Sequence, residues 1–151
     1  MPPTVHEVQA TTGSSADVTV TAPATVQAGD LLLAHVAFDG FNSPAITSVP
    51  VGWTPVEAQA DGTTVYGGWW WKRAESGDAS ASWVFTGNGN SEEWIAHCVR
   101  VTGHHPGTPI NAYAVSPHTG MSSGPWISPA VTTTVDDCLI IYSLARDGGD
   151  H

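Results

Sequence analysis

Three consecutive tryptophans, Trp69, Trp70 and Trp71, are the residues whose type and spacing most directly suggest a chemical role. On a β-strand successive side chains point to opposite faces, so Trp69 and Trp71 would share one face and Trp70 would occupy the other. Two exposed indoles on one face could stack on sugar rings. Alternatively, the indoles fill the core and pack under a loop or a neighbouring subunit, since each buries about 150–250 Å². Packing is the favoured interpretation, and we name these three residues and Trp126 as candidates for ligand or interface contacts.

The histidines and aspartates do not show the spacing of a metal site. His104 and His105 are adjacent on a loop, where their side chains point in different directions, and no carboxylate follows at a suitable spacing. Asp136 and Asp137 could supply oxygen ligands to calcium, but the D-x-D-x-D-G pattern of a calcium loop is missing. We therefore expect surface turns at both places, and neither a metal ion nor another cofactor.

The sequence also lacks the patterns that accompany catalysis. A nucleophile elbow of the form G-x-S-x-G does not occur. Glu92 and Glu93 are adjacent, so on a strand their side chains diverge, whereas paired acid chemistry needs two carboxyl groups that converge within about 5–9 Å. Residues 87–89 (Gly-Asn-Gly) resemble a hairpin tip and not a phosphate-binding loop. We expect no catalytic residues and no enzymatic activity.

Two cysteines lie within apolar stretches that are typical of strands, Cys98 in Ile95–Val99 and Cys138 in Cys138–Ile141. Buried free thiols that act as small hydrophobic side chains are the favoured interpretation. A disulfide between Cys98 and Cys138 is the alternative, and it would require neighbouring strands with Cα atoms about 5.5–6 Å apart. A zinc site is disfavoured because the sequence has no C-x-x-C pair.

The composition excludes several classes of partner. The chain has 151 residues and a formal net charge of −10, with four basic residues, Lys72, Arg73, Arg100 and Arg146. Binding to phosphates needs clustered lysine and arginine, so we expect neither nucleic acid nor an anionic membrane surface as a partner. Charged residues make up only 12% of the chain, so threonine, serine, asparagine and glycine must supply most of the polar surface. That mixture is typical of strands and turns.

Short apolar or alternating stretches separated by turn residues predict an all-β, antiparallel β-sandwich or jelly roll with eight or nine short strands and little helix. Leu31–Phe38 is apolar on both faces, which predicts a central strand covered on both sides. Asp61-Gly62 predicts a hairpin turn between two further strands. Ile110–Ser116 and Cys138–Ala145 are also predicted as strands. The latter is apolar on both faces, so we expect it to pair on both sides.

Five motifs resemble a family of β-sandwich domains found in phage tail and virion proteins and in actinobacterial surface proteins. The motifs are Ala28–Ala34 (AGDLLLA), Pro50–Thr54 (PVGWT), Trp71–Ala74 (WKRA), Trp83–Phe85 (WVF) and Pro109–Ala112 (PINA). The resemblance covers roughly residues 26–147 and implies one β-sandwich domain over residues 1–151 with buried tryptophans at positions 53 and 83. Members of the family continue for some tens of residues with another strand pair, which leaves open whether the domain is complete. The family has no catalytic residues to transfer.

The resemblance implies a structural protein of a bacteriophage particle: a capsid decoration, tail or fibre component on the virion exterior. Its expected partners are other virion proteins and further copies of the chain in a homo-oligomer. The alternative is a carbohydrate-binding or adhesin module that recognises a polysaccharide on the host cell surface. If the chain is not viral, the expected place is the extracellular bacterial surface.

Overall fold

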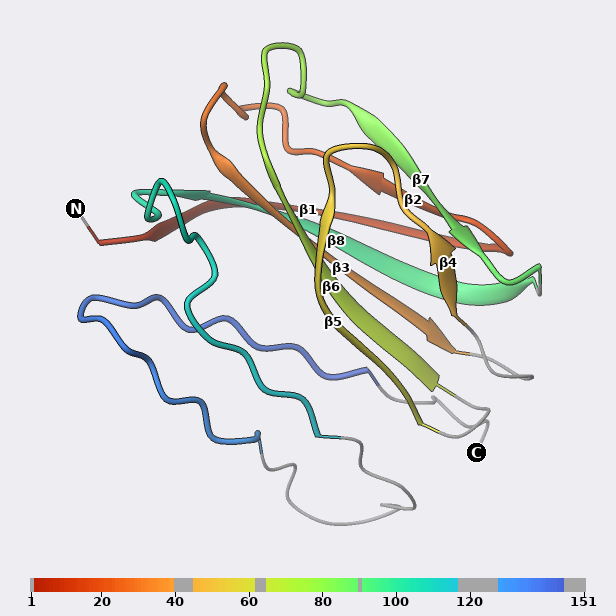
Figure 1. Ribbon diagram of the computed structural model, residues 1–151. Coiled ribbons are helices and arrows are strands. Elements are labelled where there is room, and N and C mark those ends of the chain that lie inside the picture. The colour runs from red at the N-terminus through yellow and green to blue at the C-terminus, as the bar shows by residue number, and fades with distance from the viewer. Residues whose placement is uncertain (1, 40–44, 62–64, 90, 117–127, 146–151) are drawn as a thin grey trace.

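The computed structural model describes residues 2–39, 45–61, 65–89, 91–116 and 128–145, which form two layers of strands and an irregular C-terminal part (Figure 1). Eight strands form two antiparallel sheets, and none of the residues in these ranges lies in a helix. The predicted all-β antiparallel sandwich is therefore confirmed. The division into sheets of five and three strands does not confirm the jelly-roll form.

The larger sheet has the strand order β1-β8-β3-β6-β5. Its strands are β1 (Thr4–Ser15), β8 (Glu92–Thr102), β3 (Leu31–Asp39), β6 (Val65–Arg73) and β5 (Thr54–Asp61). The central strand β3 is buried at every position except its last, because both faces of the sheet are covered. This confirms the central strand predicted from its apolar sequence. Strands β5 and β6 pair antiparallel as predicted, although Gly62 of the predicted turn lies outside the described residues.

The smaller sheet covers the inner face of the larger one and has the order β2-β7-β4. Its strands are β2 (Val18–Thr21), β7 (Ser82–Gly87) and β4 (Ile46–Ser48). The main core lies between the sheets around Phe85, which is fully buried and contacts Trp53 and Trp70 edge-on at ring-centroid distances of 5.4 and 5.3 Å. Aromatic rings prefer this arrangement because the positive edge of one faces the negative face of the other.

The two motif tryptophans do not share the same degree of burial. Trp53 is buried as predicted. Trp83 is partly buried and packs against the core from its border, so the prediction of a largely buried side chain is met only in part at this position. Its ring contacts Trp53 at 5.2 Å on one side, and the Lys72 ammonium lies 5.5 Å from its centroid. Trp83 therefore marks the border of the core, where an aromatic face meets a cation.

The C-terminal part crosses the outer face of the larger sheet without forming strands (Figure 1). The prediction that Cys138–Ala145 and Ile110–Ser116 are strands is therefore wrong. Ile110 and Ile141 pack on a second apolar cluster formed by Leu31, Leu33, Val99 and Val101 on this face. A β-strand forms only where a second strand lies beside it and pairs with its backbone. A segment that lies on the face of a sheet does not have such a neighbour, so an apolar sequence is not sufficient to predict a strand.

Candidate functional site

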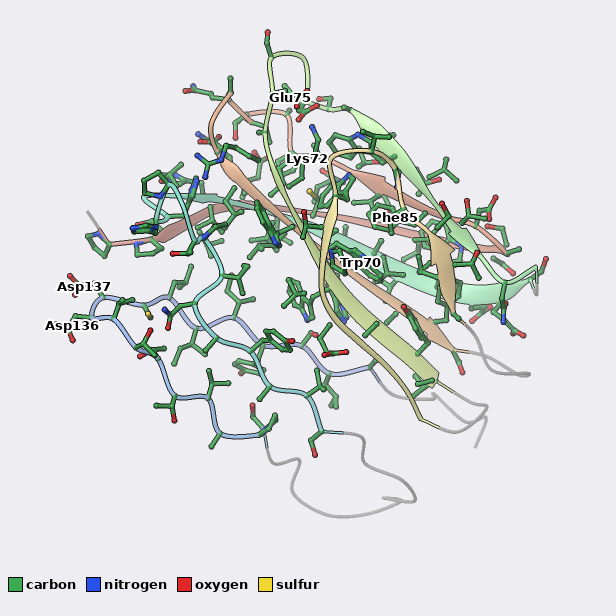
Figure 2. The ribbon with its side chains drawn as sticks, in the orientation of Figure 1. Trp70, Lys72, Glu75, Phe85, Asp136 and Asp137 are labelled. Carbon is green, nitrogen blue, oxygen red and sulfur yellow. The ribbon has the colours of Figure 1, made fainter. Side chains whose placement is uncertain are left out.

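The structure places the tryptophan triplet on both faces of β6, as the alternation predicted. Trp70 points into the core, where it is 4% exposed and lies beside Phe85 (Figure 2). Trp69 and Trp71 are partly buried and pack on the outer cluster. The inward position of Trp70 makes it a core residue. Trp126 lies outside the described residues.

Trp69 holds the C-terminal segment onto the outer face. Its indole Nε1 donates a hydrogen bond to Ser143 Oγ at 2.9 Å. A Cβ placed on nearby Gly67 would lie only 3.2 Å from the Ala145 Cβ, so the segment passes close to the backbone of β6. One of the two outward indoles is therefore engaged within the chain, as the favoured packing interpretation expects, and the alternative of two exposed indoles side by side as a platform is not available.

Trp71 instead borders an open pocket of about 440 Å³ between β5 and the start of the C-terminal part. The lining residues are Pro55, Val56, Trp71, Ile110, Asn111, Ala112 and Tyr113. The Asn111 amide donates to Thr134 Oγ1, and its carbonyl oxygen accepts from the Thr134 N–H, both at 2.9 Å, which joins the two outer segments. Tyr113 is 56% exposed at this pocket. The Asn111 amide is therefore engaged within the chain, and the two aromatic side chains of this uncharged lining suit a small, partly apolar ligand.

Two histidines lie under the same C-terminal segment. His35 on β3 is 4% exposed and stacks with His97 on β8 at a ring-centroid distance of 6.0 Å. The Trp69 ring lies 4.9 Å from His35 on its other side. Burial, with a smaller contribution from the neighbouring His97, lowers the pKa of His35 to about 4. His35 is therefore neutral at pH 7, as an apolar outer cluster requires.

The lysine of the W-K-R-A motif stabilises a turn within the fold. Lys72 is buried, and its Nζ forms an ion pair with Asp78 Oδ2 at 2.6 Å. The same carboxylate oxygen accepts the Glu75 N–H at 2.8 Å, so Lys72 fixes the turn at Glu75 that follows β6 (Figure 2). A charge-assisted hydrogen bond of this kind leaves the ammonium little capacity for an external anion.

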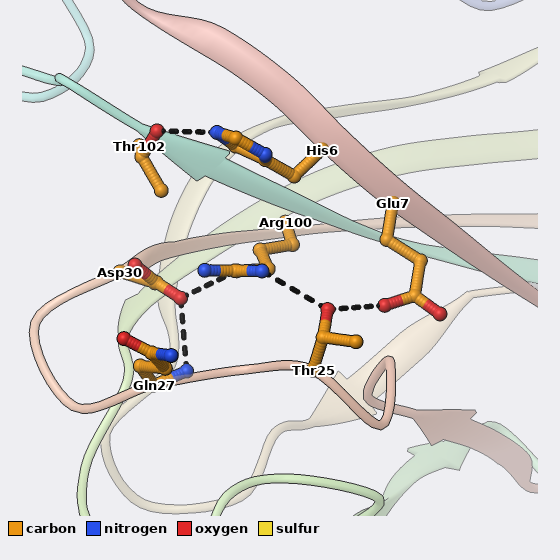
Figure 3. Close-up of polar contacts among 7 residues, drawn as sticks. All are labelled: His6, Glu7, Thr25, Gln27, Asp30, Arg100 and Thr102. Carbon is orange, nitrogen blue, oxygen red and sulfur yellow. Dashed lines mark hydrogen bonds and ion pairs between the residues drawn. The ribbon is translucent and has the colours of Figure 1, made fainter.

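Arg100 on β8 forms the second ion pair, with Asp30 Oδ2 at 2.6 Å (Figure 3). Asp30 Oδ2 also accepts the Gln27 N–H at 2.9 Å, and Arg100 donates to Thr25 Oγ1 at 3.0 Å. Thr25 in turn donates to the Glu7 carboxylate on β1. The network joins the loop that carries the A-G-D motif to the edge of the larger sheet, so Asp30 of that motif has a structural role.

Arg73, the remaining cation among the described residues, donates a hydrogen bond to the Pro106 carbonyl. Each lysine and arginine that the structure describes is thus engaged within the chain. Lys72, Arg73 and Arg100 each bind a different partner within the chain.

The cysteines are free, so the structure does not contain the alternative disulfide. Cys98 is fully buried, and burial, together with a smaller effect of Asp78, raises the pKa of its thiol to about 12. A thiol with this pKa stays protonated at neutral pH and is a poor nucleophile. Cys138 is partly buried on the C-terminal segment, where its Sγ contacts the Val135 carbonyl at 3.4 Å.

Carboxylates and histidines form no cluster of three potential metal ligands within the described ranges. Asp136 and Asp137 lie at a loop tip, and their side chains point away from the sheets (Figure 2). His105 Nδ1 accepts the Gly107 and Thr108 N–H groups at 3.2 and 3.0 Å, which makes it a turn residue. These residues belong to loops, and their side chains do not point toward a common metal site.

The sequence interpretation did not identify the contribution of Tyr113 to the pocket. No local signal marks this residue, because the pocket forms only when the segment after β8 folds back beside β5.

No protein-family model matches the chain, and no curated protein or solved structure matches it significantly. Within the described residues, no helix has the length and apolar character needed to cross a membrane.

Proposed function

We propose that the chain is a non-catalytic structural component of a bacteriophage particle, a capsid decoration, tail or fibre protein that contacts neighbouring virion proteins on the exterior. The motif resemblance supports the viral setting. The observation that carries the proposal is an exposed apolar row on the C-terminal segment, formed by Ile140, Tyr142 and Leu144, which are 72%, 80% and 55% exposed. We call these three residues the outer row.

The C-terminal segment has apolar residues on both of its faces, and the outer row is the face that does not pack on the sheet. In an extended chain alternate residues share a side, and here Ile141 packs on the larger sheet while the outer row points away from it. Large exposed apolar side chains in one segment are unusual on a monomer and are typical of a surface that another protein covers. No cofactor and no bond-making group is needed for this role.

Incorporation into particles tests the proposal. Replacing Ile140 and Tyr142 by serine should leave the free energy of unfolding within about 0.5 kcal/mol, because both side chains are exposed. The same double variant should be lost from assembled particles, as measured by its amount in purified virions. The control is Val51→Ser, because Val51 is 98% exposed on the loop before β5, outside the outer row. Incorporation of the double variant at the wild-type level would contradict the proposal.

A second candidate function is adhesion to a host glycan, which the Trp71 pocket favours. Aromatic side chains at an open pocket suit a sugar ring, and the net charge of −10 favours an uncharged sugar over an anionic one. If this function holds, Trp71→Ala and Tyr113→Ala should each weaken binding to host cell walls by about tenfold, or 1.4 kcal/mol. The measurement is sedimentation with purified cell walls, with thermal melting to verify folding.

The control for the glycan experiment is Val56→Ala at the same pocket, which removes apolar contact without removing an aromatic ring. Equal losses for Val56→Ala and Trp71→Ala would argue against stacking on a sugar. If the wild-type protein does not sediment with cell walls, the adhesion function is excluded and the structural role stands alone.

A further inference from the structure

The edges of the two sheets differ in how well they are protected against pairing with another strand. A sheet edge exposes unpaired N–H and C=O groups, and natural sheets protect them with short strands, proline, charged residues or bulges. The edges of the smaller sheet are β2 and β4, which have only four and three residues. The β5 edge of the larger sheet carries Pro55, Glu57 and a register shift between them. These three edges are therefore protected.

The fourth edge, β1, is not protected over most of its length. It has 12 residues, is paired on one side with β8, and from Val8 to Ser15 contains neither a charged residue nor a proline. Its register shift lies earlier, between Val5 and Glu7. The side chain of Val8 is 52% exposed, and Ala10 is also exposed. The stretch Val8–Ser15 is thus a long, uncharged edge with one exposed face, while on its other face Thr11 Oγ1 donates to the Thr19 carbonyl of β2 at 2.6 Å.

We infer that the Val8–Ser15 edge is the self-association surface of this protein, and that its partner is the same strand of a second copy. The two β1 strands would pair antiparallel around a two-fold axis at Ala10 and join the larger sheets into one continuous sheet. This inference rests on the proposed function for its biological setting and specifies which surface joins the copies.

The sequence of β1 is complementary to itself in this register. Antiparallel pairing around Ala10 places Val8 opposite Thr12 and Gln9 opposite Thr11, with Ala10 opposite its own copy. Even Glu7, the one carboxylate of the strand, would face Gly13, so no like charges lie opposite one another. A symmetric pairing of this kind gives a closed dimer, because each edge is used once.

At the centre of the edge a second strand would share the Ala10 carbonyl with a side chain of β1. The Ala10 carbonyl accepts a hydrogen bond from its neighbour Gln9 Nε2 at 3.0 Å, and a carbonyl oxygen has a second lone pair. The net charge of −10 on each copy opposes association at long range, and salt screens this repulsion over about 8 Å at 0.15 M. Dimerisation should therefore strengthen as salt is raised, unlike a contact that depends on ion pairs.

Sedimentation equilibrium of the purified chain and its Ala10→Lys variant tests the inference. The wild type should dimerise, and Ala10→Lys should weaken the dimer by at least about tenfold because the two lysines would face each other across the axis. The matched control, Val84→Lys, places the same charge at an exposed position in the middle of the smaller sheet and should not change dimerisation. A wild-type chain that stays monomeric up to about 1 mM, or a dimer that Ala10→Lys leaves intact, would overturn the inference.

Cross-linking tests the register in a Cys138→Ser background. Ala10→Cys should form a disulfide between copies on mild oxidation, because residues opposite each other in antiparallel strands have Cα atoms about 4.5–5.5 Å apart. Thr4→Cys lies on the same strand but would be far from its copy, so it should cross-link slowly. Equal rates for the two variants would overturn the register. A dimer with this register that is absent from particles would contradict the proposed function and leave the inference intact.

Discussion

Replacing Phe85 by alanine should lower the free energy of unfolding by about 3–5 kcal/mol, as the removal of a buried aromatic side chain does elsewhere. Phe85 is fully buried between the sheets and contacts both Trp53 and Trp70, so neither sheet can close the resulting space without moving an indole. Chemical denaturation followed by tryptophan fluorescence measures the effect. Phe85→Leu should cost less because it leaves a smaller cavity.

Val84 supplies the control for Phe85 on the same strand. Its side chain points to the opposite face of β7 and is 53% exposed. Val84→Ala should therefore change the unfolding free energy by no more than about 0.5 kcal/mol. If Phe85→Ala and Val84→Ala were equally mild, the two sheets would not pack around Phe85 as described.

Acidification should destabilise the protein through His35. Its pKa is about 4 in the folded protein and 6.5 in the unfolded chain. Between these two values the unfolded chain binds more protons, so stability is greatest above pH 6.5 and falls as the pH is lowered through this window. The difference of 2.5 pKa units corresponds to about 3 kcal/mol at 1.36 kcal/mol per unit. Urea unfolding at pH 7 and pH 4 measures this loss.

Carboxylates also titrate in acid, so a variant is needed to isolate the histidine contribution. His35→Gln removes the titrating group, and its stability should depend on pH by about 3 kcal/mol less than the wild type between pH 7 and pH 4. His6→Gln, at an exposed position on β1, should keep most of the wild-type dependence. If His35→Gln showed the wild-type dependence on pH, the acid sensitivity would arise elsewhere.

The elements that could be predicted from the sequence are those whose environment is set by neighbours in the same sheet. The uninterrupted apolar run of β3 required cover on both faces, and the alternation of Trp69, Trp70 and Trp71 required two faces of one strand. Local pattern is sufficient in these cases because the strand period of two residues fixes which side chains share a face.

The C-terminal segment could not be predicted in the same way. Its apolar residues do occupy two sides, but one side packs on the outer cluster and the other forms the outer row. Composition alone cannot distinguish an inner strand from an extended segment on the face of a sheet, because both are apolar on two sides. A strand can also extend through residues whose composition is typical of a turn, because pairing with a neighbour overrides local preference. Residues Thr12–Ser15 have the composition of a turn, yet pairing with β8 extends the strand through them.

The contacts around the candidate site were even harder to predict, because they join residues that are far apart in the sequence. The ion pair between Asp30 and Arg100 and the contact between Trp69 and Ser143 each join positions at least 70 residues apart. The sequence pattern marked Asp30 and Trp69 as motif or candidate residues but gave no indication of their partners. The alternation correctly placed Trp69 and Trp71 on one face, but it did not show that Trp69 binds Ser143 while Trp71 borders the pocket.

Hydrogen exchange along residues 138–145, in the free protein and in assembled particles, tests the central claim most directly. None of the backbone–backbone hydrogen bonds found outside the strands in the described residues involves this segment, so its amides should exchange rapidly in the free protein. If the outer row binds a neighbouring virion protein, the same amides should exchange much more slowly in the particle. Equally rapid exchange in both states would contradict the assembly role proposed for this surface.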